Sequence, residues 1–275
     1  MGTQHCRRGH PNALPDRWLA LLLAIGLLAA ILFHSVLAKP LLSVTRFWVY
    51  FPFLSRREAC QPIPGETYIA LSADGPGPHI PAEVHPDLNL AVHGYEPMNA
   101  YKGLVDYPGP HDPNAPQFHD LFADRRLPTF HSVYQLYGWD WAHMRRGPLI
   151  TDPPVTVLGL GAAQGETLHV PDSGYTIGSG FEVLVLYASS DRITLKYTRE
   201  DNVVSGYTLH VDRICVEPSL LALYQACNHA GRAYLPALRP RQAFGRALGD
   251  EVVIAIVDSG TFLDPRSRQD WWRAH

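Results

Sequence analysis

Two histidines and one glutamate are the side chains of this chain best suited to hold a metal ion or to move a proton. They are His169, His210 and Glu251, and each lies in a separate run of β-branched and apolar residues. Imidazole nitrogens and a carboxylate are the protein ligands that catalytic zinc uses, with a water molecule in the remaining position. Their spacing does not bring them together, so they are a weak candidate site.

Motifs of the commoner enzyme chemistries are missing from the sequence. His79, His85 and His93 are separated by six and eight residues, and no H-E-x-x-H spacing occurs, so we interpret them as hydrogen-bonded loop histidines. The sequence at 178–180 (GSG) lacks the outer glycines of a nucleophile elbow. The glycines at 159 and 161 precede a strand rather than a helix, so no phosphate loop is predicted.

Short β-type segments carry the candidate residues. From residue 155 onward, runs rich in β-branched and aromatic side chains are separated by turn formers. These runs cover residues 155–158, 166–170, 181–187, 192–197, 207–211 and 251–257. They predict a mainly β body, folded as a compact antiparallel barrel or sandwich. One amphipathic helix is predicted over 218–231, where apolar residues recur at helical spacing.

The region before these strands is dense in proline and glycine, from Pro62 to Pro116. Such a stretch disfavours long helices. Residues 87–92 alternate polar and apolar side chains and predict a strand, and the aromatic segment 134–141 predicts another. We therefore predict a Pro-rich β extension over residues 60–150, packed on a second β domain at 151–275.

Two segments resemble the opening and closing strands of the lysostaphin-type (LytM-like) zinc endopeptidases, which cleave peptidoglycan cross-bridges. The first, Gly165–Gly174 (GETLHVPDSG), resembles the family pattern G-T-x-V-x-A-x-x-x-G. The second is Val253–Pro265 (VIAIVDSGTFLDP), in which a glycine stands four positions before the Asp-Pro that ends the fold. The segment 241–245 (RQAFG) resembles the family's G-Q-x-I-G, with Arg241 in place of glycine. The resemblance covers about residues 150–267 and implies a β-sandwich of the duplicated-hybrid type.

The resemblance also implies a metal site, whose ligands this chain lacks. The family's H-x-x-x-D positions fall on Val155 and Gly159, and its H-x-H positions fall on Glu251 and Val253. Valine and glycine side chains have no lone pair to give a metal ion. We therefore predict no zinc, no other cofactor and no catalytic residue.

A second histidine of the family, in a Y-x-H motif, has two partial matches here. Tyr197–Arg199 has arginine in place of the histidine, and Tyr207–His210 is one residue longer than the motif. Since a slip of one residue moves a side chain to the opposite face of a sheet, His210 is either a groove residue or a structural one. The candidate binding residues are Glu251, His210, Tyr197, Arg199 and His169.

Degenerate relatives of this kind bind cell wall or activate amidases. The resemblance thus implies a non-catalytic, peptidase-like domain that binds or positions a cell-envelope partner, either peptidoglycan or an envelope protein. The alternative is a cell-wall metallohydrolase with a rearranged metal site, built from ligands such as His169, His210 and Glu251.

The N-terminal part predicts a membrane anchor. Residues 18–38 contain no Asp, Glu, Lys or Arg, and such a run is long enough for a bilayer core of about 30 Å. Arginines in segment 1–17 predict a cytoplasmic N-terminus, and the aromatic segment 39–59 predicts an interfacial belt. The alternative is a secretory signal cleaved after Ala38. Both interpretations place the main body outside the cytoplasm.

Charge and cysteine content add two expectations. The net charge of −3, with scattered Lys and Arg, does not predict nucleic-acid binding. Cys6 would face the cytoplasm, which leaves Cys60, Cys215 and Cys227 outside. Because a short helix could bring Cys215 and Cys227 together, we predict either a disulfide between them or two buried thiols.

Overall fold

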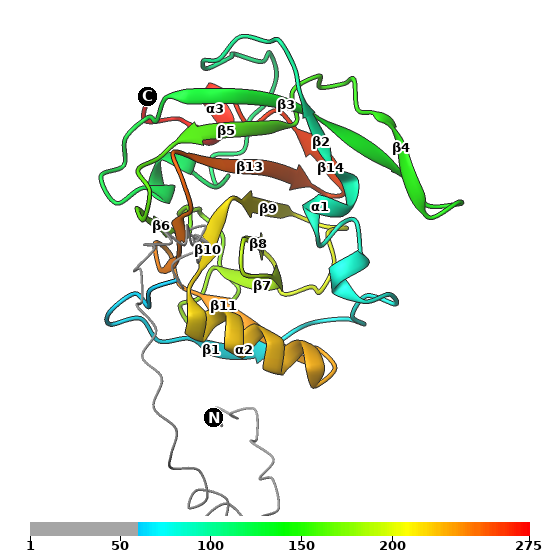
Figure 1. Ribbon diagram of the computed structural model, residues 1–275, viewed down its shortest axis with the longest axis vertical. Coiled ribbons are helices and arrows are strands. Elements are labelled where there is room, and N and C mark those ends of the chain that lie inside the picture. The colour runs from blue at the N-terminus through cyan, green and yellow to red at the C-terminus, as the bar shows by residue number, and fades with distance from the viewer. Residues whose placement is uncertain (1–59) are drawn as a thin grey trace, which may run out of the picture. The chain divides into compact units, whose positions relative to one another are not determined.

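Residues 60–275, the part of the chain that the computed structural model describes, form a mainly β structure of antiparallel strands (Figure 1). The strands are β1 (Ile69–Ser72), β2 (Tyr95–Pro97), β3 (Phe130–Asp140), β4 (Arg145–Leu149), β5 (Val157–Gly161), β6 (Thr167–His169), β7 (Val183–Ala188), β8 (Arg192–Lys196), β9 (Tyr207–Asp212), β10 (Ile214–Val216), β11 (Tyr234–Leu238), β12 (Ala243–Ala247), β13 (Glu251–Asp258) and β14 (Thr261–Leu263). The helices are η1 (Ala82–Val84), α1 (Leu90–His93), η2 (Phe118–Leu121), α2 (Pro218–His229) and α3 (Arg268–Trp271). The prediction of a mainly β body is confirmed.

The predicted anchor at 18–38 and its flanking segments 1–17 and 39–59 lie outside the described residues. Within residues 60–275, none of the helices is both long enough and apolar enough to span a membrane.

One large sheet has the strand order β1-β11-β7-β8-β9-β13-β5-β3-β2, with β14 paired to β13 and β4 paired to β3. A smaller sheet has the order β10-β12-β6. Figure 1 shows the large sheet running from β3 and β5 through β13 and β9 to β11 and β1, with α2 beside β11 and β1. The strand pairs in both sheets are antiparallel.

The boundary predicted between residues 150 and 151 does not divide this sheet. In the β1–β11 pair Ile69 lies opposite Ala237, and in the β3–β5 pair Tyr134 lies opposite Val157. The strands of 60–150 therefore complete the sheet of the following residues instead of packing on it as an extension, and the prediction is corrected. The physical reason is that β5 and β11 would otherwise expose unpaired edges.

Strand β13 is covered on both faces, which explains its uninterrupted apolar sequence. Val252, Ile254 and Ile256 point into the main hydrophobic core, whereas Val253 and Ala255 belong to a smaller cluster on the other face. Alternate residues of a strand point to opposite faces, so both sets are buried only where both faces are covered. The candidate functional site lies on the second face, which carries Val253 and Ala255.

The predicted amphipathic helix is confirmed as α2. Glu217 caps it, because its Oε2 accepts a hydrogen bond of 2.9 Å from the Leu220 backbone N–H, and Pro218 occupies the first turn. The helix packs on β11, β7 and β1.

The predicted disulfide partner is wrong. Cys215 on β10 is bonded to Cys60, with the two Cα atoms 5.7 Å apart. Cys227 is buried on α2 and is not bonded to Cys215.

The strand predicted over residues 87–92 is also wrong, because this region contains the single-turn helix α1. The Asn89 side chain caps the helix by accepting from the Ala91 N–H at 3.2 Å. Gly94, with φ 70°, ends it. A local side-chain cap therefore outweighs an alternation that extends over only six residues.

Candidate functional site

Two of the positions that the resemblance assigns to metal ligands lie side by side on neighbouring strands. Gly159 on β5 is paired with Val253 on β13, and Val253 is fully buried. The Glu251 carboxylate packs directly on Gly159, so that a Cβ atom at Gly159 would collide with it. Val155 is not part of this group, because it lies in the main core while Val253 lies in the smaller cluster.

Glu251 is enclosed in a polar cluster with Tyr134 and Arg213. The residue is only 8% exposed. Its Oε1 accepts a hydrogen bond of 2.9 Å from the Tyr134 hydroxyl and a second from the Arg213 guanidinium. The guanidinium also lies 5.5 Å from the centre of the Tyr134 ring. One oxygen of the carboxylate is thus engaged by two donors inside the protein, one of which carries a positive charge.

His210 lies on the same face of the sheet, two strands from β5, and is a buried structural residue. It is 1% exposed, and its Nδ1 lies 3.1 Å from the Thr194 hydroxyl. That hydroxyl donates to the Leu88 carbonyl at 2.6 Å, so the Nδ1–H of His210 is the donor to Thr194. Burial, followed by the nearby His93, lowers the pKa of His210 to about 3. The imidazole is therefore neutral at physiological pH.

Residues 82–97, which we call the covering segment, lie over this face of the sheet. Leu90 packs in the same cluster as Val253. The His93 ring lies 5.3 Å from Phe262, which in turn stacks at 6.1 Å on His210. The His93 Nδ1 is 2.7 Å from the Tyr137 carbonyl. In Figure 1 the segment passes beside β9 and β14. The position that resembles a metal site is therefore closed by the chain itself.

The other predicted site residues lie elsewhere. Tyr197 is buried in the main core, where its hydroxyl donates to the Pro171 carbonyl at 2.9 Å. Arg199 contacts Ser72, donating to its carbonyl at 2.6 Å. His169 belongs to the small sheet, and burial lowers its pKa. The structure brings His210 and Glu251 to one face and leaves Tyr197, Arg199 and His169 away from it. Within residues 60–275, no group of three or more His, Cys, Asp or Glu side chains is arranged to hold a metal ion.

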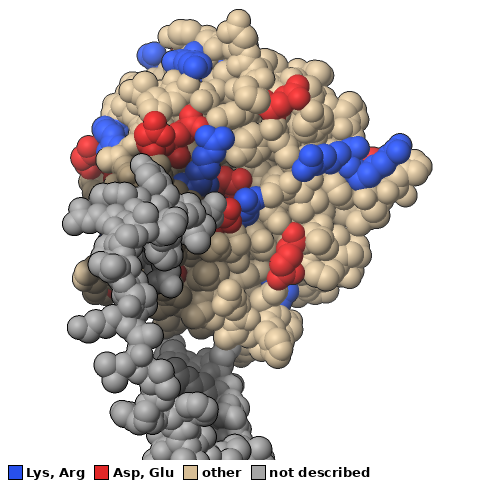
Figure 2. All heavy atoms as spheres, in the orientation of Figure 1, with Lys and Arg blue, Asp and Glu red and all other residues tan. Residues whose placement is uncertain are grey.

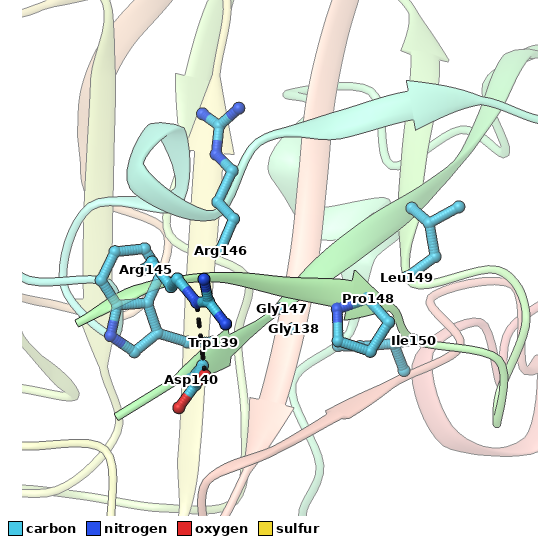
Figure 3. A pocket seen from close by; sticks show the side chains of 9 residues that line it. All are labelled: Gly138, Trp139, Asp140, Arg145, Arg146, Gly147, Pro148, Leu149 and Ile150. Atoms are coloured by element: carbon cyan, nitrogen blue, oxygen red, sulfur yellow. Dashed lines mark ion pairs between the residues drawn. The ribbon is translucent and has the colours of Figure 1, made fainter. Parts of the chain in front are cut away.

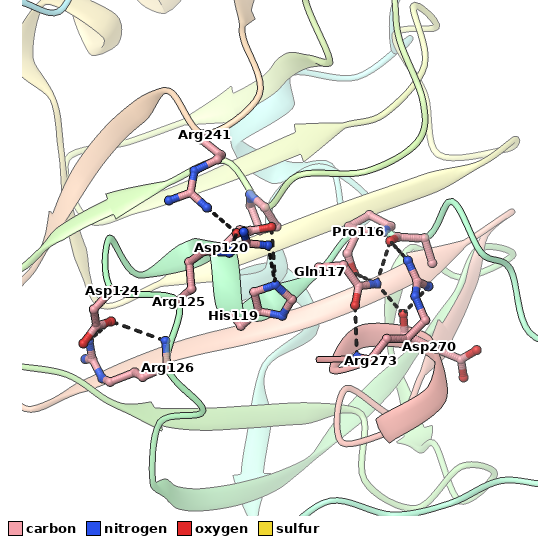
Figure 4. A network of polar contacts seen from close by, with 12 residues as sticks. Pro116, Gln117, His119, Asp120, Asp124, Arg125, Arg126, Arg241, Asp270 and Arg273 are labelled. Atoms are coloured by element: carbon pink, nitrogen blue, oxygen red, sulfur yellow. Dashed lines mark hydrogen bonds and ion pairs between the residues drawn. The ribbon is translucent and has the colours of Figure 1, made fainter. Parts of the chain in front are cut away.

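A buried carboxylate that the sequence did not reveal lies at the end of η2. Asp120 is held by Arg125, whose Nε is 2.7 Å away, and by Arg241 (Figure 4). Arg241 has a φ of 56°, a conformation that favours glycine, and it is the residue that replaces glycine in the resembled G-Q-x-I-G. Its ion pair with Asp120 helps hold this backbone. The only sign of this ion pair in the sequence is Arg241, which stands where the G-Q-x-I-G motif has glycine.

A second hidden carboxylate is Glu182, which precedes β7. It is fully buried, and within the described chain neither of its oxygens makes a hydrogen bond of good geometry, although Ser173 lies close enough to interact with it. Burial raises its pKa to about 8, against the opposing effect of the nearby Ser173. Lys196 on β8 is a buried basic residue, and burial lowers its pKa to about 8. Each interrupts an apolar run, which is the only sequence signal for either.

The β3–β4 hairpin projects from the sheet and forms an open hollow of about 560 Å³ (Figure 3). Asp140 and Arg145 form an ion pair at 3.5 Å. Arg146 extends away from them and donates to the carbonyls of Ala91 and Val92 at 3.1 and 2.9 Å. These bonds fix the hairpin to the covering segment. On the face shown in Figure 2, basic and acidic side chains are interspersed.

In comparisons with protein-family models, curated proteins and solved structures, none matched this chain. The likeness to lysostaphin-type peptidases therefore stays a prediction, which depends on the motifs quoted from the sequence.

Proposed function

We propose that residues 60–275 form a non-catalytic, peptidase-like β domain that binds or positions a partner in the cell envelope. The observation that carries the proposal is the filled metal position. Val253 lies opposite Gly159, and Glu251 is engaged by Tyr134 and Arg213. Zinc requires several lone-pair donors in tetrahedral geometry, and this position offers one carboxylate, which already accepts from Tyr134 and pairs with Arg213.

The covering segment supports the same proposal. A peptide substrate on this face would have to displace Leu88 and Leu90, which are fully buried, and the hydrogen bond from Thr194 to Leu88. Displacing one such leucine alone costs about 1.5 to 3 kcal/mol. Contact with a partner therefore uses the outer surface of the domain and not the filled position.

The proposed location is outside the cytoplasm, behind an anchor at residues 18–38 or after cleavage of a signal at Ala38. The disulfide between Cys60 and Cys215 supports this location, because disulfides persist in oxidising compartments.

Metal analysis of the purified protein, combined with sedimentation and digestion of peptidoglycan sacculi, tests the proposal. We expect the protein to sediment with sacculi, to carry no stoichiometric zinc and to release no soluble fragments. Stoichiometric zinc together with fragment release would overturn it and favour the alternative, a metallohydrolase with a rearranged site.

A matched variant sharpens the test. Glu251→Gln should leave sedimentation with sacculi unchanged, because the carboxylate is enclosed. In a metallohydrolase that uses Glu251 as a ligand, the same change would abolish fragment release. If the wild-type protein does not sediment, cross-linking in intact cells distinguishes an envelope-protein partner from no envelope partner at all.

A further inference from the structure

A hollow of about 430 Å³ lies beside the covering segment, separate from the filled metal position. We call it the Trp141 pocket, and its main lining residues are Pro78, His79, His85, Asp87, Trp141 and Val203. Its volume falls in the range of small-molecule sites, roughly 300 to 1,000 Å³. Neither the resemblance nor the proposed function assigns it a role.

The aromatic wall of the pocket is held in place. Trp141 follows β3 and is 44% exposed, so part of its indole faces solvent. Its ring lies 5.6 Å from the His85 ring at an interplanar angle of 62°. The hairpin that carries it is fixed by the hydrogen bonds of Arg146 to the covering segment. The indole of Trp141 is therefore held in a fixed orientation on the wall of the pocket.

Asp201 lines the pocket and is held in an ion pair by Arg232, which is not itself a lining residue. Arg232 binds both oxygens of Asp201, at 2.8 and 2.5 Å, and donates to the Leu186 carbonyl at 2.8 Å. The loop at Gly77 packs so closely on this pair that a Cβ atom there would lie 2.9 Å from Asp201 Oδ2. Both oxygens of Asp201 are therefore engaged by Arg232, and the ion pair makes this part of the pocket rigid.

Two polar side chains of the pocket are His85, which is buried, and Asp87, which is half-buried. His85 is 7% exposed, and its Nδ1 has no hydrogen bond within the described chain. Burial, followed by His79, lowers the pKa of His85 to about 4, so the imidazole is neutral at physiological pH. Burial also raises the pKa of Asp87 to about 6, and no arginine or lysine lines the pocket. A buried imidazole nitrogen without a partner costs free energy, which a ligand that pairs with His85 would offset.

We propose that the Trp141 pocket binds a pyranose ring of a glycan. The apolar C–H face of the ring would pack on the indole of Trp141, and its hydroxyls would donate to Asp87 and pair with His85. An anion would meet the Asp87 carboxylate with no basic side chain to balance it. A fully apolar ligand would leave both Asp87 and His85 unpaired.

A primary amine is the competing ligand, since it could pair with Asp87 and rest on the indole. It would leave the apolar walls at Pro78 and Val203 uncovered, so the pyranose is the better match. The inference deepens the proposed function by naming a class of envelope ligand, and it rests on that function only for the source of the glycan.

Calorimetric titration of the full-length protein tests the pocket. The probes are a β-1,4-linked N-acetylglucosamine disaccharide, cellobiose and the amine Nα-acetyl-lysine. We expect saturable binding of at least one disaccharide, weakened about tenfold or more by Trp141→Ala, as expected when an aromatic anchor is lost. Trp141→Phe should restore part of the affinity. Tyr101→Ala, which changes an aromatic residue that is 70% exposed and outside the pocket, should have no effect.

Three outcomes would overturn the inference. They are no disaccharide binding at millimolar concentration, disaccharide binding that Trp141→Ala leaves unchanged, and binding of the amine alone. Circular dichroism of Trp141→Ala separates loss of the pocket from loss of the fold.

Sedimentation with sacculi separates this inference from the proposed function. If the wild-type protein sediments but binds no disaccharide, the pocket inference fails and the proposed function stands. If it binds a disaccharide in the pocket but neither sediments nor cross-links to an envelope protein, the proposed function fails and the pocket inference stands.

Discussion

Replacing Glu182 with glutamine should reduce the loss of stability that this domain suffers between about pH 6 and about pH 9. Glu182 is fully buried, and burial raises the pKa of its carboxyl from 4.5 to about 8. A folded-state pKa above the unfolded value stabilises the fold at low pH. That contribution is fully present below pH 4.5 and is lost as the pH rises through 8.

The size of the effect follows from the shift. At about 1.4 kcal/mol per pKa unit, the whole shift corresponds to roughly 5 kcal/mol. Between about pH 6 and about pH 9, linkage gives a loss of roughly 2.5 kcal/mol from this carboxyl alone. Glutamine has a similar shape and no charge, so Glu182→Gln should lose about that much less stability over the same interval.

The assay is urea unfolding of the full-length protein, followed by tryptophan fluorescence at several pH values. Glu83→Gln, which removes a carboxylate from an exposed position, is the matched control and should leave the pH profile unchanged. Parallel profiles for the wild type and Glu182→Gln would refute the reasoning, because Glu182 would then have to be ionised in the fold with partners that satisfy it.

His210 acts in the opposite direction and at lower pH. Its folded-state pKa of about 3 lies below the ordinary value of 6.5, so its contribution is lost as the pH falls below 6.5. This contribution is the same in the wild type and in Glu182→Gln, so it cancels when the two pH profiles are compared.

Three further changes test the packing described above. Gly159→Ala should cost about 1 to 3 kcal/mol, because the added methyl group collides with the Glu251 carboxylate, and an unchanged unfolding midpoint would mean that this carboxylate can move away. Asp201→Ala should cost about 3 to 5 kcal/mol by leaving buried Arg232 unpaired, and a loss below 1 kcal/mol would show that solvent reaches the guanidinium. Cys60→Ser should lower the free energy of unfolding by about 3 to 5 kcal/mol, since the lost disulfide joins residues 155 apart in sequence; equal thermal stability in the presence and absence of reductant would contradict it.

The sequence predicted the elements whose signals are local. The apolar run of β13 and the spacing of apolar residues in α2 are both local patterns, and both elements form where they were predicted. The helix α1 was missed because the Asn89 cap is a side-chain contact, whereas a strand was predicted from side-chain alternation. The pairing of Cys215 with Cys60 was missed because it depends on contacts between residues far apart in sequence.

In the candidate site, too, local signals could be read from the sequence, whereas contacts between distant residues could not. His210 and Glu251 lie on one face because β9 pairs with β13 in a register that puts His210 opposite Ala255, and no single segment of the sequence specifies that pairing. The covering segment could not be predicted either, because its burial depends on the face that it meets. Glu182 and Lys196 were visible only as charged residues within apolar runs.

The central place of β13 governs how this sheet is assembled. β13 is the last long strand of the chain, yet it joins β9 on one side to β5 on the other. The β7–β8–β9 meander can form from nearby contacts, whereas β3 and β5 reach it only through a strand that is synthesised about ninety residues later than β5, and such late, non-local pairing slows folding. Until residues 251–258 leave the ribosome, the two halves of the sheet stay separate with open edges, and a chain truncated before them would expose both edges to aggregation.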